Sequence, residues 1–183
     1  MNQSTRLWAG KWGVRDIAYC GLIGALYAVL TIILAPLSYG VYQIRVAEAL
    51  TVLPFIYAPA ALGLFAGCFV ANIFGGNGLI DIIFGSLLTL ISGVATAMLS
   101  RLGSKGISAI ALLAPMPPVV INALGVSLYL SKIMEVPYWS TVTLVGTGQL
   151  IACYALGLPF LIFLLLMKKT PLRADESQES KLN

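Results

Sequence analysis

Uncharged apolar runs alternate along this chain with short segments that carry the charged residues. Five long runs contain no Asp, Glu, Lys or Arg: residues 17–44, 49–80, 82–100, 106–131 and 136–167. About 20 helical residues cross a hydrocarbon core of about 30 Å, so each run is long enough to span a membrane. Lipid offers the backbone no hydrogen-bond partners, and such runs must therefore form helices. The pattern predicts an all-α membrane protein.

The run at residues 49–80 is too long for one ordinary span, and Pro54 and Pro59 interrupt it. We divide it into two short helices joined by a turn near Pro59. The chain is then expected to form a bundle of six transmembrane helices, at about 15–35, 46–57, 59–74, 79–101, 106–131 and 141–167. The second of these is shorter than a usual span, so whether it crosses completely is left open.

Composition and charge agree with a multi-pass protein of the cell membrane. Hydrophobic residues make up 59% of the chain and charged residues 10%, outside the range of soluble domains. Basic residues precede the first helix and follow the last, and the positive-inside rule then places both termini in the cytoplasm. This requires an even number of crossings, which six satisfies and five does not. Because the basic residues lie at helix ends, we interpret them as orientation signals and not as a nucleic-acid surface.

Three segments follow from this topology. Residues 1–14 are expected to be a cytoplasmic N-terminal segment, residues 15–168 the transmembrane domain, and residues 169–183 a disordered cytoplasmic tail. The first apolar run is too long for the core of a signal peptide and is followed by further helices. It is therefore expected to remain in the mature protein.

The most informative charges are Arg45 and Glu48, which adjoin the run 49–80. Residues three apart can pair on a helical turn. Such a pair could extend to the lipid headgroups as an interfacial ion pair. Alternatively, it could be partly buried and bind a polar ligand. The cost of a charge beside so long an apolar run favours the second interpretation.

A second acidic residue, Asp81, is isolated near the outer end of the fourth expected helix. A carboxylate there could simply interact with the helix dipole. In the six-helix topology, however, several polar residues share the outer half of the bundle, which predicts one outward-facing polar pocket. They are Glu48, Asn72, Asn77, Asp81 and Gln149.

Two further positions leave alternatives open. Asn122 either joins the pocket or hydrogen-bonds a backbone carbonyl freed by Pro117 and Pro118. Tyr42 either anchors the chain at the membrane interface or stacks, beside Gln43, on a flat heterocycle.

Small residues recur at four-residue spacing in the first expected helix, as Gly21 with Ala25 and Gly24 with Ala28. Such stripes let helices approach closely. They serve either packing inside the bundle or docking to another membrane protein. A similar stripe at Gly63 and Gly67 is expected to pack inside the bundle.

Residue patterns typical of catalysis, metal binding and nucleotide binding are absent from the sequence. There is no His, no paired Cys, no GxxxxGK[ST] loop and no HExxH motif. Cys20, Cys68 and Cys153 are scattered through apolar helices and are interpreted as small buried hydrophobic residues. An enzyme, a metal site and a bound cofactor are therefore not expected, and ATP could energise transport only through partner subunits.

Three stretches carry a resemblance to a known family: YQIRVAEALTVLP at 42–54, GLFAGCFVAN at 63–72 and GLIDIIFGS at 78–86. They resemble the QueT family of queuosine-precursor transporters, over roughly residues 14–168. Membership implies the substrate-binding (S) component of an energy-coupling factor (ECF) transporter, with six helices and cytoplasmic termini. Such a component captures a small molecule from outside. It works in the membrane with a transmembrane coupling subunit and two cytoplasmic ATPase subunits.

The resemblance implies a deazaguanine ligand such as preQ0 or preQ1, bound within the domain 15–168. One carboxylate can accept the adjacent N–H and amino donors of a guanine-like edge. The expected binding residues are Tyr42, Gln43, Arg45, Glu48, Asn72, Asp81 and Gln149. Gln149 stands where an acidic residue is common in the family.

The family's first helix typically docks the coupling subunit through small residues. Here the corresponding candidates are Gly21, Gly24, Ala25 and Ala28, with Gly in place of the first Ala. A self-contained small channel or secondary carrier for a polar solute is the alternative function. A membrane scaffold without a ligand is a third class, disfavoured because polar residues cluster at one depth.

Overall fold

The computed structural model describes residues 13–39, 44–102 and 108–167, and in these ranges the chain forms helices and no strand. The all-α prediction is therefore confirmed. The elements are α2 (Val14–Ile33), α3 (Ala35–Ser38), η2 (Val46–Phe55), α4 (Ala60–Phe74), α5 (Gly78–Ile80), η3 (Asp81–Gly85), α6 (Ser86–Leu99), α7 (Ala109–Leu112), α8 (Met116–Ile133), α9 (Tyr138–Leu150), η4 (Ile151–Gly157) and a helical continuation over 158–167. Among these, η2 is a 3₁₀-helix, while η3 and η4 are π-helical segments.

Four helical stretches of the described chain are long and apolar enough to cross a membrane. They are Val14–Ile33, Gly78–Leu99, Ala109–Ile133 and Tyr138–Met167. The apolar helices η2 and α4 are shorter. Six complete crossings thus remain a prediction. The expected helix at 106–131 is interrupted between α7 and α8, where Pro115 lacks a backbone N–H and restricts the residue before it.

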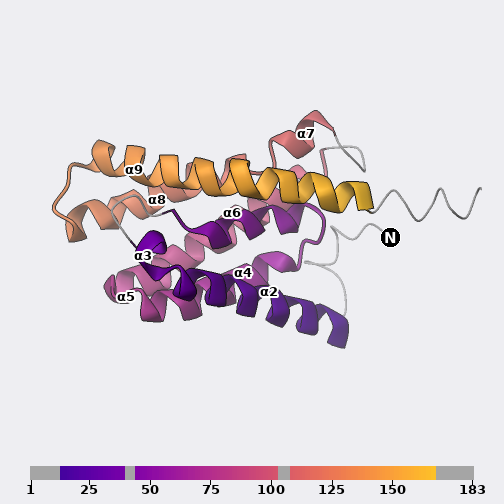
Figure 1. The fold of residues 1–183 in the computed structure, drawn as a ribbon, viewed down its shortest axis with the longest axis horizontal. Helices are drawn as coiled ribbons and strands as arrows, with labels where there is room; N and C mark the ends of the chain where they lie inside the picture. Colours follow the sequence, from indigo (N-terminus) through magenta and orange to yellow (C-terminus); the bar gives the residue numbers. More distant parts are fainter. Residues whose placement is uncertain (1–12, 40–43, 103–107, 168–183) are drawn as a thin grey trace, which may run out of the picture.

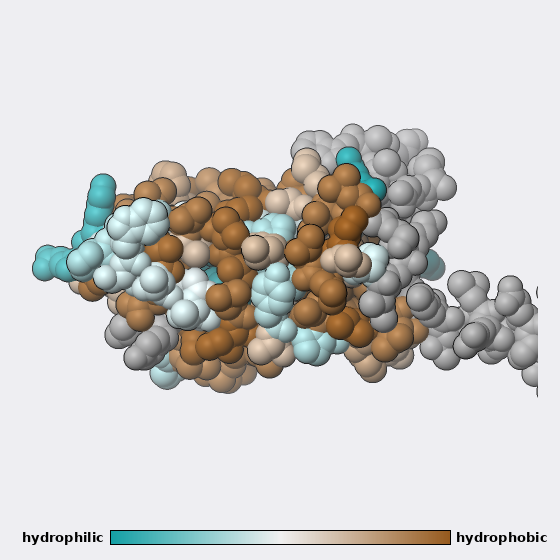
Figure 2. Space-filling view, turned by 90° about the horizontal axis from the view of Figure 1, so that it is seen from above, coloured by the Kyte–Doolittle hydropathy of each residue, from teal (hydrophilic) through white to brown (hydrophobic). Residues whose placement is uncertain are grey.

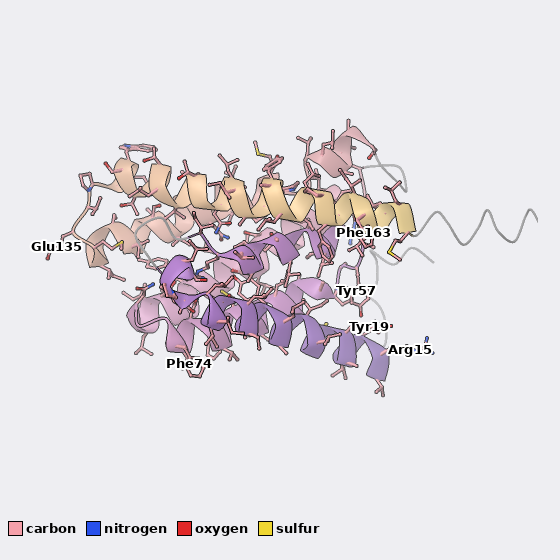
Figure 3. The ribbon with its side chains drawn as sticks, viewed as in Figure 1. Arg15, Tyr19, Tyr57, Phe74, Glu135 and Phe163 are labelled. Carbon is pink, nitrogen blue, oxygen red and sulfur yellow. The ribbon has the colours of Figure 1, made fainter. Side chains whose placement is uncertain are left out.

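The long elements run between two opposite ends of the bundle (Figure 1). Arg15 and Tyr57 lie toward one end, and Phe74 and Glu135 toward the other (Figure 3). The start of α2 and the end of the helix that continues from η4 lie at the same end (Figure 1). This agrees with an even number of crossings, but which end faces the cytoplasm remains a prediction. The expected terminal segments 1–14 and 169–183 fall almost entirely outside the described residues.

The short helix η2 lies in the middle of the bundle, where it packs against α2, α6 and η4. A 3₁₀-helix has three residues per turn and rises about 2.0 Å per residue. Ten residues therefore reach about 20 Å in this form, against about 15 Å in an α-helix. The same period places Glu48, Thr51 and Pro54 on one face of η2, and all three are buried.

Glycines allow α2 and α4 to pack closely against each other. A Cβ on Gly24 would lie 2.8 Å from the carbonyl oxygen of Gly63, and one on Gly67 would collide with the carbonyl of Gly24. A Cβ on Gly63 would lie 2.6 Å from the carbonyl oxygen of Cys20. No larger residue fits at these positions without separating the helices, so the stripe at Gly63 and Gly67 serves internal packing, as expected.

The outer surface is strongly apolar, whereas many buried positions are small or polar. Large hydrophobic side chains are exposed on every long helix, among them Leu22, Ile91, Leu128 and Phe163. Apolar residues cover most of the middle of the face shown in Figure 2. An exposed apolar surface of this extent is unfavourable in water and favourable in lipid. The molecule is therefore built for a membrane.

The helices that carry Asp81 and Gln149 each contain a π-helical segment, η3 and η4, which ends at a buried glycine. A π-segment inserts one extra residue into a helix and is frequent at functional sites. The final glycine of η4, Gly157, allows close packing on η2, because a Cβ there would lie 3.0 Å from the carbonyl oxygen of Ala49. The segment η4 thus borders the central helix η2. The segment η3 carries Asp81, which pairs with Arg45 at the start of η2.

Candidate ligand-binding site

Glu48 is a buried carboxylate at the centre of the bundle, with 1% of its surface exposed. Its Oε1 accepts a hydrogen bond from the Tyr27 hydroxyl at 2.6 Å, and its Oε2 accepts one from Asn122 Nδ2 at 3.3 Å. Both donors are uncharged. The second bond is long for one that ends on a carboxylate, so this oxygen retains capacity for a further donor.

Arg45 forms an ion pair with Asp81, with 3.5 Å between Nη2 and Oδ2. Asp81 also accepts hydrogen bonds from the Tyr129 hydroxyl at 2.5 Å and from Asn77 Nδ2 at 3.0 Å. The Arg45 guanidinium lies 5.2 Å from the centroid of the Tyr39 ring, a cation–π contact. The two oxygens of Asp81 are therefore occupied by groups of the protein itself.

The expected pairing of Arg45 with Glu48 is wrong. Arg45 is the N-cap of η2, with an extended backbone at φ −85° and ψ 100°. Its carbonyl oxygen accepts from the Glu48 N–H at 2.9 Å, but its side chain does not pair with the Glu48 carboxylate. Its side chain reaches η3 instead, where Asp81 begins the π-segment. The two carboxylates consequently have different surroundings: Asp81 neutralises Arg45, and Glu48 is held by neutral donors.

Asn72 lies beside Asp81 but bonds to its backbone. Asn72 Nδ2 donates to the Asp81 carbonyl oxygen at 2.9 Å and lies 3.5 Å from the Cys68 sulfur. This contact joins α4 to η3 and positions Asp81. Asn72 is 1% exposed, and its Oδ1 has no partner among the described residues.

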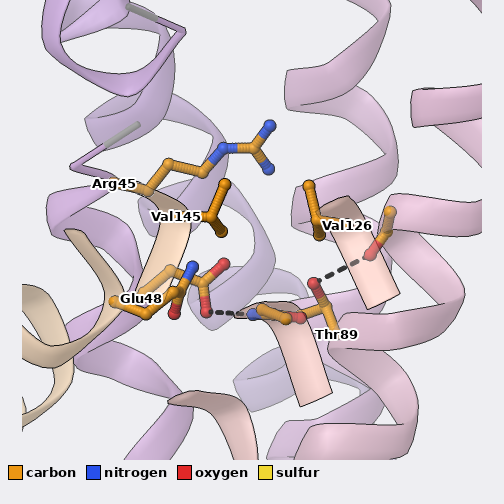
Figure 4. A pocket seen from close by; sticks show the side chains of 8 residues that line it. Arg45, Glu48, Thr89, Val126 and Val145 are labelled. Atoms are coloured by element: carbon orange, nitrogen blue, oxygen red, sulfur yellow. Dashed lines mark hydrogen bonds between the residues drawn. The ribbon is translucent and has the colours of Figure 1, made fainter. Parts of the chain in front are cut away.

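A small cavity opens between these elements, and Glu48 forms part of its wall. Its volume is about 10 Å³, which is room for about one water. Arg45 and Glu48 border it from one side, and Thr89 and Val126 from the other (Figure 4). The full lining is Arg45, Glu48, Gly85, Thr89, Asn122, Val126, Val145 and Gln149.

The sequence-predicted pocket residues thus divide into two groups. Arg45, Glu48 and Gln149 line the cavity, whereas Asn72 and Asp81 lie in the hydrogen-bond network behind it. Tyr42 and Gln43 lie outside the described residues.

Asn122 belongs to the cavity and does not bond a backbone carbonyl near Pro117 and Pro118. Its amide nitrogen donates to Glu48. The alternative interpretation, in which Asn122 only hydrogen-bonds a backbone carbonyl freed by these prolines, is therefore wrong.

Residues that sequence reasoning missed complete the network. Tyr27 and Tyr129 supply the short hydrogen bonds to Glu48 and Asp81. The sulfur of Cys68 accepts from Arg45 Nη1 at 3.8 Å and from Thr89 Oγ1 at 3.4 Å. The only sequence signal for the two tyrosines was a phenol within an uncharged run, where a hydroxyl needs a partner.

The small residues of α2 separate onto two faces. Gly24 and Ala28 are buried, and Gly24 packs on α4, so these two cannot form an exposed docking surface in this conformation. Gly21 and Ala25 are exposed, and a Cβ on Gly21 would meet no atom within 4 Å. The structure therefore narrows the docking candidates to Gly21 and Ala25.

The described residues contain no group of three His, Cys, Asp or Glu side chains that could hold a metal ion. The arrangement is that of a buried polar cavity inside an apolar bundle. Such a site can bind a small polar molecule and shield it from lipid.

Comparison with known proteins agrees with this architecture. The sequence model of the QueT transporter family matches residues 17–166, which is most of the chain and includes every residue of the cavity wall. No curated protein and no solved structure gives a significant match. Family membership supports a transport role, in keeping with the membrane helices. The chain belongs to the QueT transporter family.

Proposed function

We propose that this chain is the substrate-binding S component of an ECF-type importer and captures a queuosine precursor from outside the cell. The ligand is a deazaguanine such as preQ1 or preQ0. The observation that carries the proposal is the position of Glu48, a buried carboxylate that lines a cavity and is paired only with neutral donors. A buried carboxylate of this kind is well suited to accept the adjacent N–H and amino donors of a guanine-like edge.

The other polar residues take supporting roles in this proposal. Gln149 and Thr89 border the same cavity and can meet further polar atoms of the ring. Val126 and Val145 supply apolar surface for its faces. Asp81 holds Arg45 in place through the ion pair, assisted by Tyr129. Tyr42 and Gln43 remain candidates for contacts at the outer side of the ligand.

The cavity must enlarge before a bicyclic ring can enter, because it now has room for about one water. In the described structure the cavity is therefore too small for such a ring. We expect the enlargement to separate the elements that meet at the cavity, η2, α6, α8 and α9. Rearrangements of this kind on binding are common in transport and regulatory proteins.

The energy for transport is proposed to come from partners. The sequence has no phosphate-binding loop, so a transmembrane coupling subunit and two ATPase subunits would supply ATP hydrolysis. The exposed face of α2 around Gly21 and Ala25 is the proposed contact with the coupling subunit. The cytoplasmic position of both termini belongs to the same proposal.

Calorimetric titration of the purified protein with preQ1, preQ0, queuine and riboflavin tests the ligand class. We expect saturable binding of a deazaguanine and none of riboflavin. A parallel uptake assay in liposomes separates an S component from a self-contained carrier. Binding without uptake by the protein alone supports the proposal, whereas uptake by the protein alone contradicts the S-component assignment. Absence of any deazaguanine binding contradicts the ligand class.

A further inference from the structure

One residue that lines the cavity has a buried polar atom without a partner. Asn122, on α8, is 2% exposed, and its Oδ1 is buried without a hydrogen bond among the described residues. The orientation of the amide follows from its neighbour: a carboxylate only accepts, so the nitrogen must face Glu48 and the oxygen must face away from it. A buried acceptor without a donor destabilises the structure that contains it.

A second unpartnered atom, also on a residue that lines the cavity, has the opposite polarity. Nε of Arg45 is buried and donates to no described residue, although the rest of the guanidinium is bonded to Asp81 and Cys68. The residues that line the cavity therefore carry an unused acceptor on Asn122, an under-used acceptor on Glu48 and an unused donor on Arg45. A ligand edge that carries N–H donors next to a carbonyl oxygen would satisfy all three.

Other unpartnered polar atoms do not share this position. Ser127 lies on the same helix as Asn122, and its Oγ is also buried without a partner, but Ser127 does not line the cavity. The combination of burial, a free acceptor and a place in the cavity wall is therefore specific to Asn122 within α8.

We propose that Asn122 is a specificity-determining residue, whose Oδ1 accepts a hydrogen bond from the exocyclic amino group of the bound deazaguanine. This inference rests on the proposed function, and it identifies the ligand group that the site recognises. The hydrogen bond from Asn122 Nδ2 to Glu48 Oε2 holds the two acceptor-bearing side chains next to each other. One amino group has two hydrogens and can donate to both, while the neighbouring ring N–H donates to the carboxylate.

The inference predicts that the protein prefers ligands with the exocyclic amino group, and that this preference depends on Asn122. 7-Deazahypoxanthine has the same ring as 7-deazaguanine without the amino group. A site built to bond a polar group rejects an analogue that lacks it, because its buried atoms are then left unpaired. The parent protein is expected to bind 7-deazaguanine about 10- to 100-fold more tightly than 7-deazahypoxanthine.

The test is a four-way titration with the two rings, the parent protein and the Asn122→Leu variant. Leu has a similar size but no polar atoms. The variant is expected to lose about 10-fold or more in affinity for 7-deazaguanine and little for 7-deazahypoxanthine, so the preference collapses. Asn122→Ala carries the same expectation if the Leu variant does not fold. Ser127→Ala is the matched control and should keep the parental preference.

Three outcomes overturn the inference in distinguishable ways. Equal losses for both rings would assign Asn122 a structural role and leave the proposed function intact. Equal affinity of the parent protein for both rings would show, without any variant, that the site does not recognise the exocyclic amino group. A parent protein that binds neither ring, nor preQ1 or preQ0, would overturn the proposed function together with the inference.

Discussion

The hydroxyl of Tyr27 donates to Oε1 of Glu48 over 2.6 Å, and neither side chain is exposed beyond 1%. This bond joins α2 to the central 3₁₀-helix η2. A carboxylate at such a depth is stabilised only by the donors that reach it. Tyr27 therefore fixes one oxygen of Glu48 and leaves the other directed toward Asn122 and the cavity wall.

Removal of the Tyr27 hydroxyl should destabilise the protein. In Tyr27→Phe, Oε1 of Glu48 would be buried without a donor, which costs about 1–3 kcal/mol of unfolding free energy. Thermal unfolding in detergent measures the loss. Tyr57→Phe is the matched control, since Tyr57 donates to Asp16 at a half-buried site where water can replace the hydroxyl. A larger loss for Tyr57→Phe than for Tyr27→Phe would contradict this account of Glu48.

The ion pair of Arg45 and Asp81 predicts strong energetic coupling. Asp81→Asn would leave a buried guanidinium without its counter-charge, at a cost of about 3–5 kcal/mol. Arg45→Gln should cost a similar amount for the reverse reason. The double variant removes both charges and should lose clearly less stability than the sum of the two single losses. Unfolding of all four proteins completes the cycle, and additive losses would refute the pairing.

Two glycines of the same helix should respond differently to the same substitution. Gly24→Leu places a side chain against the backbone of Gly63, and should separate α2 from α4 and prevent stable folding. Gly21→Leu projects into open space and should preserve folding and ligand binding. If Gly21 belongs to the proposed docking face, co-purification with the coupling subunit should fall. Full transport by Gly21→Leu would rule out that face.

Gly85 ends the π-segment η3 and borders the cavity. A Cβ there would lie 2.7 Å from Oδ1 of Asp81 and 3.0 Å from the Tyr129 hydroxyl. Gly85→Ala should therefore displace Asp81 and weaken both stability and ligand affinity. Gly146→Ala is the control, because its Cβ would make only an ordinary contact, 3.5 Å from Ala123. Equal behaviour of the two variants in unfolding and titration would show that Gly85 has no special role.

The uncharged runs predicted the helices well because lipid leaves the backbone few alternatives. The first helix was expected at 15–35 and is observed as α2 at Val14–Ile33, and the helix expected at 59–74 is observed as α4 at Ala60–Phe74. The isolation of Glu48 and Asp81 between apolar runs marked both as candidate functional residues, and the structure buries both more deeply than the partly buried, outward-facing pocket that we expected.

What the sequence could not reveal depended on local backbone geometry. The spacing of Arg45 and Glu48 suggested a pair only if both residues had a helical backbone, and the backbone at Arg45 is extended. A stripe of small residues does not tell which face meets a partner, so Gly24 could not be distinguished from Gly21. The donors Tyr27 and Tyr129 become recognisable only when helices distant in sequence are packed together.

Titration of preQ1 into Glu48→Gln tests the central claim most directly. Glu135→Gln is the matched control, since Glu135 is exposed at the end of the bundle where α8 and α9 are joined. Loss of a hydrogen-bonded charge in a buried site should weaken binding at least 10-fold in Glu48→Gln, while Glu135→Gln should bind like the parent protein. Parental affinity in a folded Glu48→Gln variant would contradict the assignment of this cavity as the ligand site.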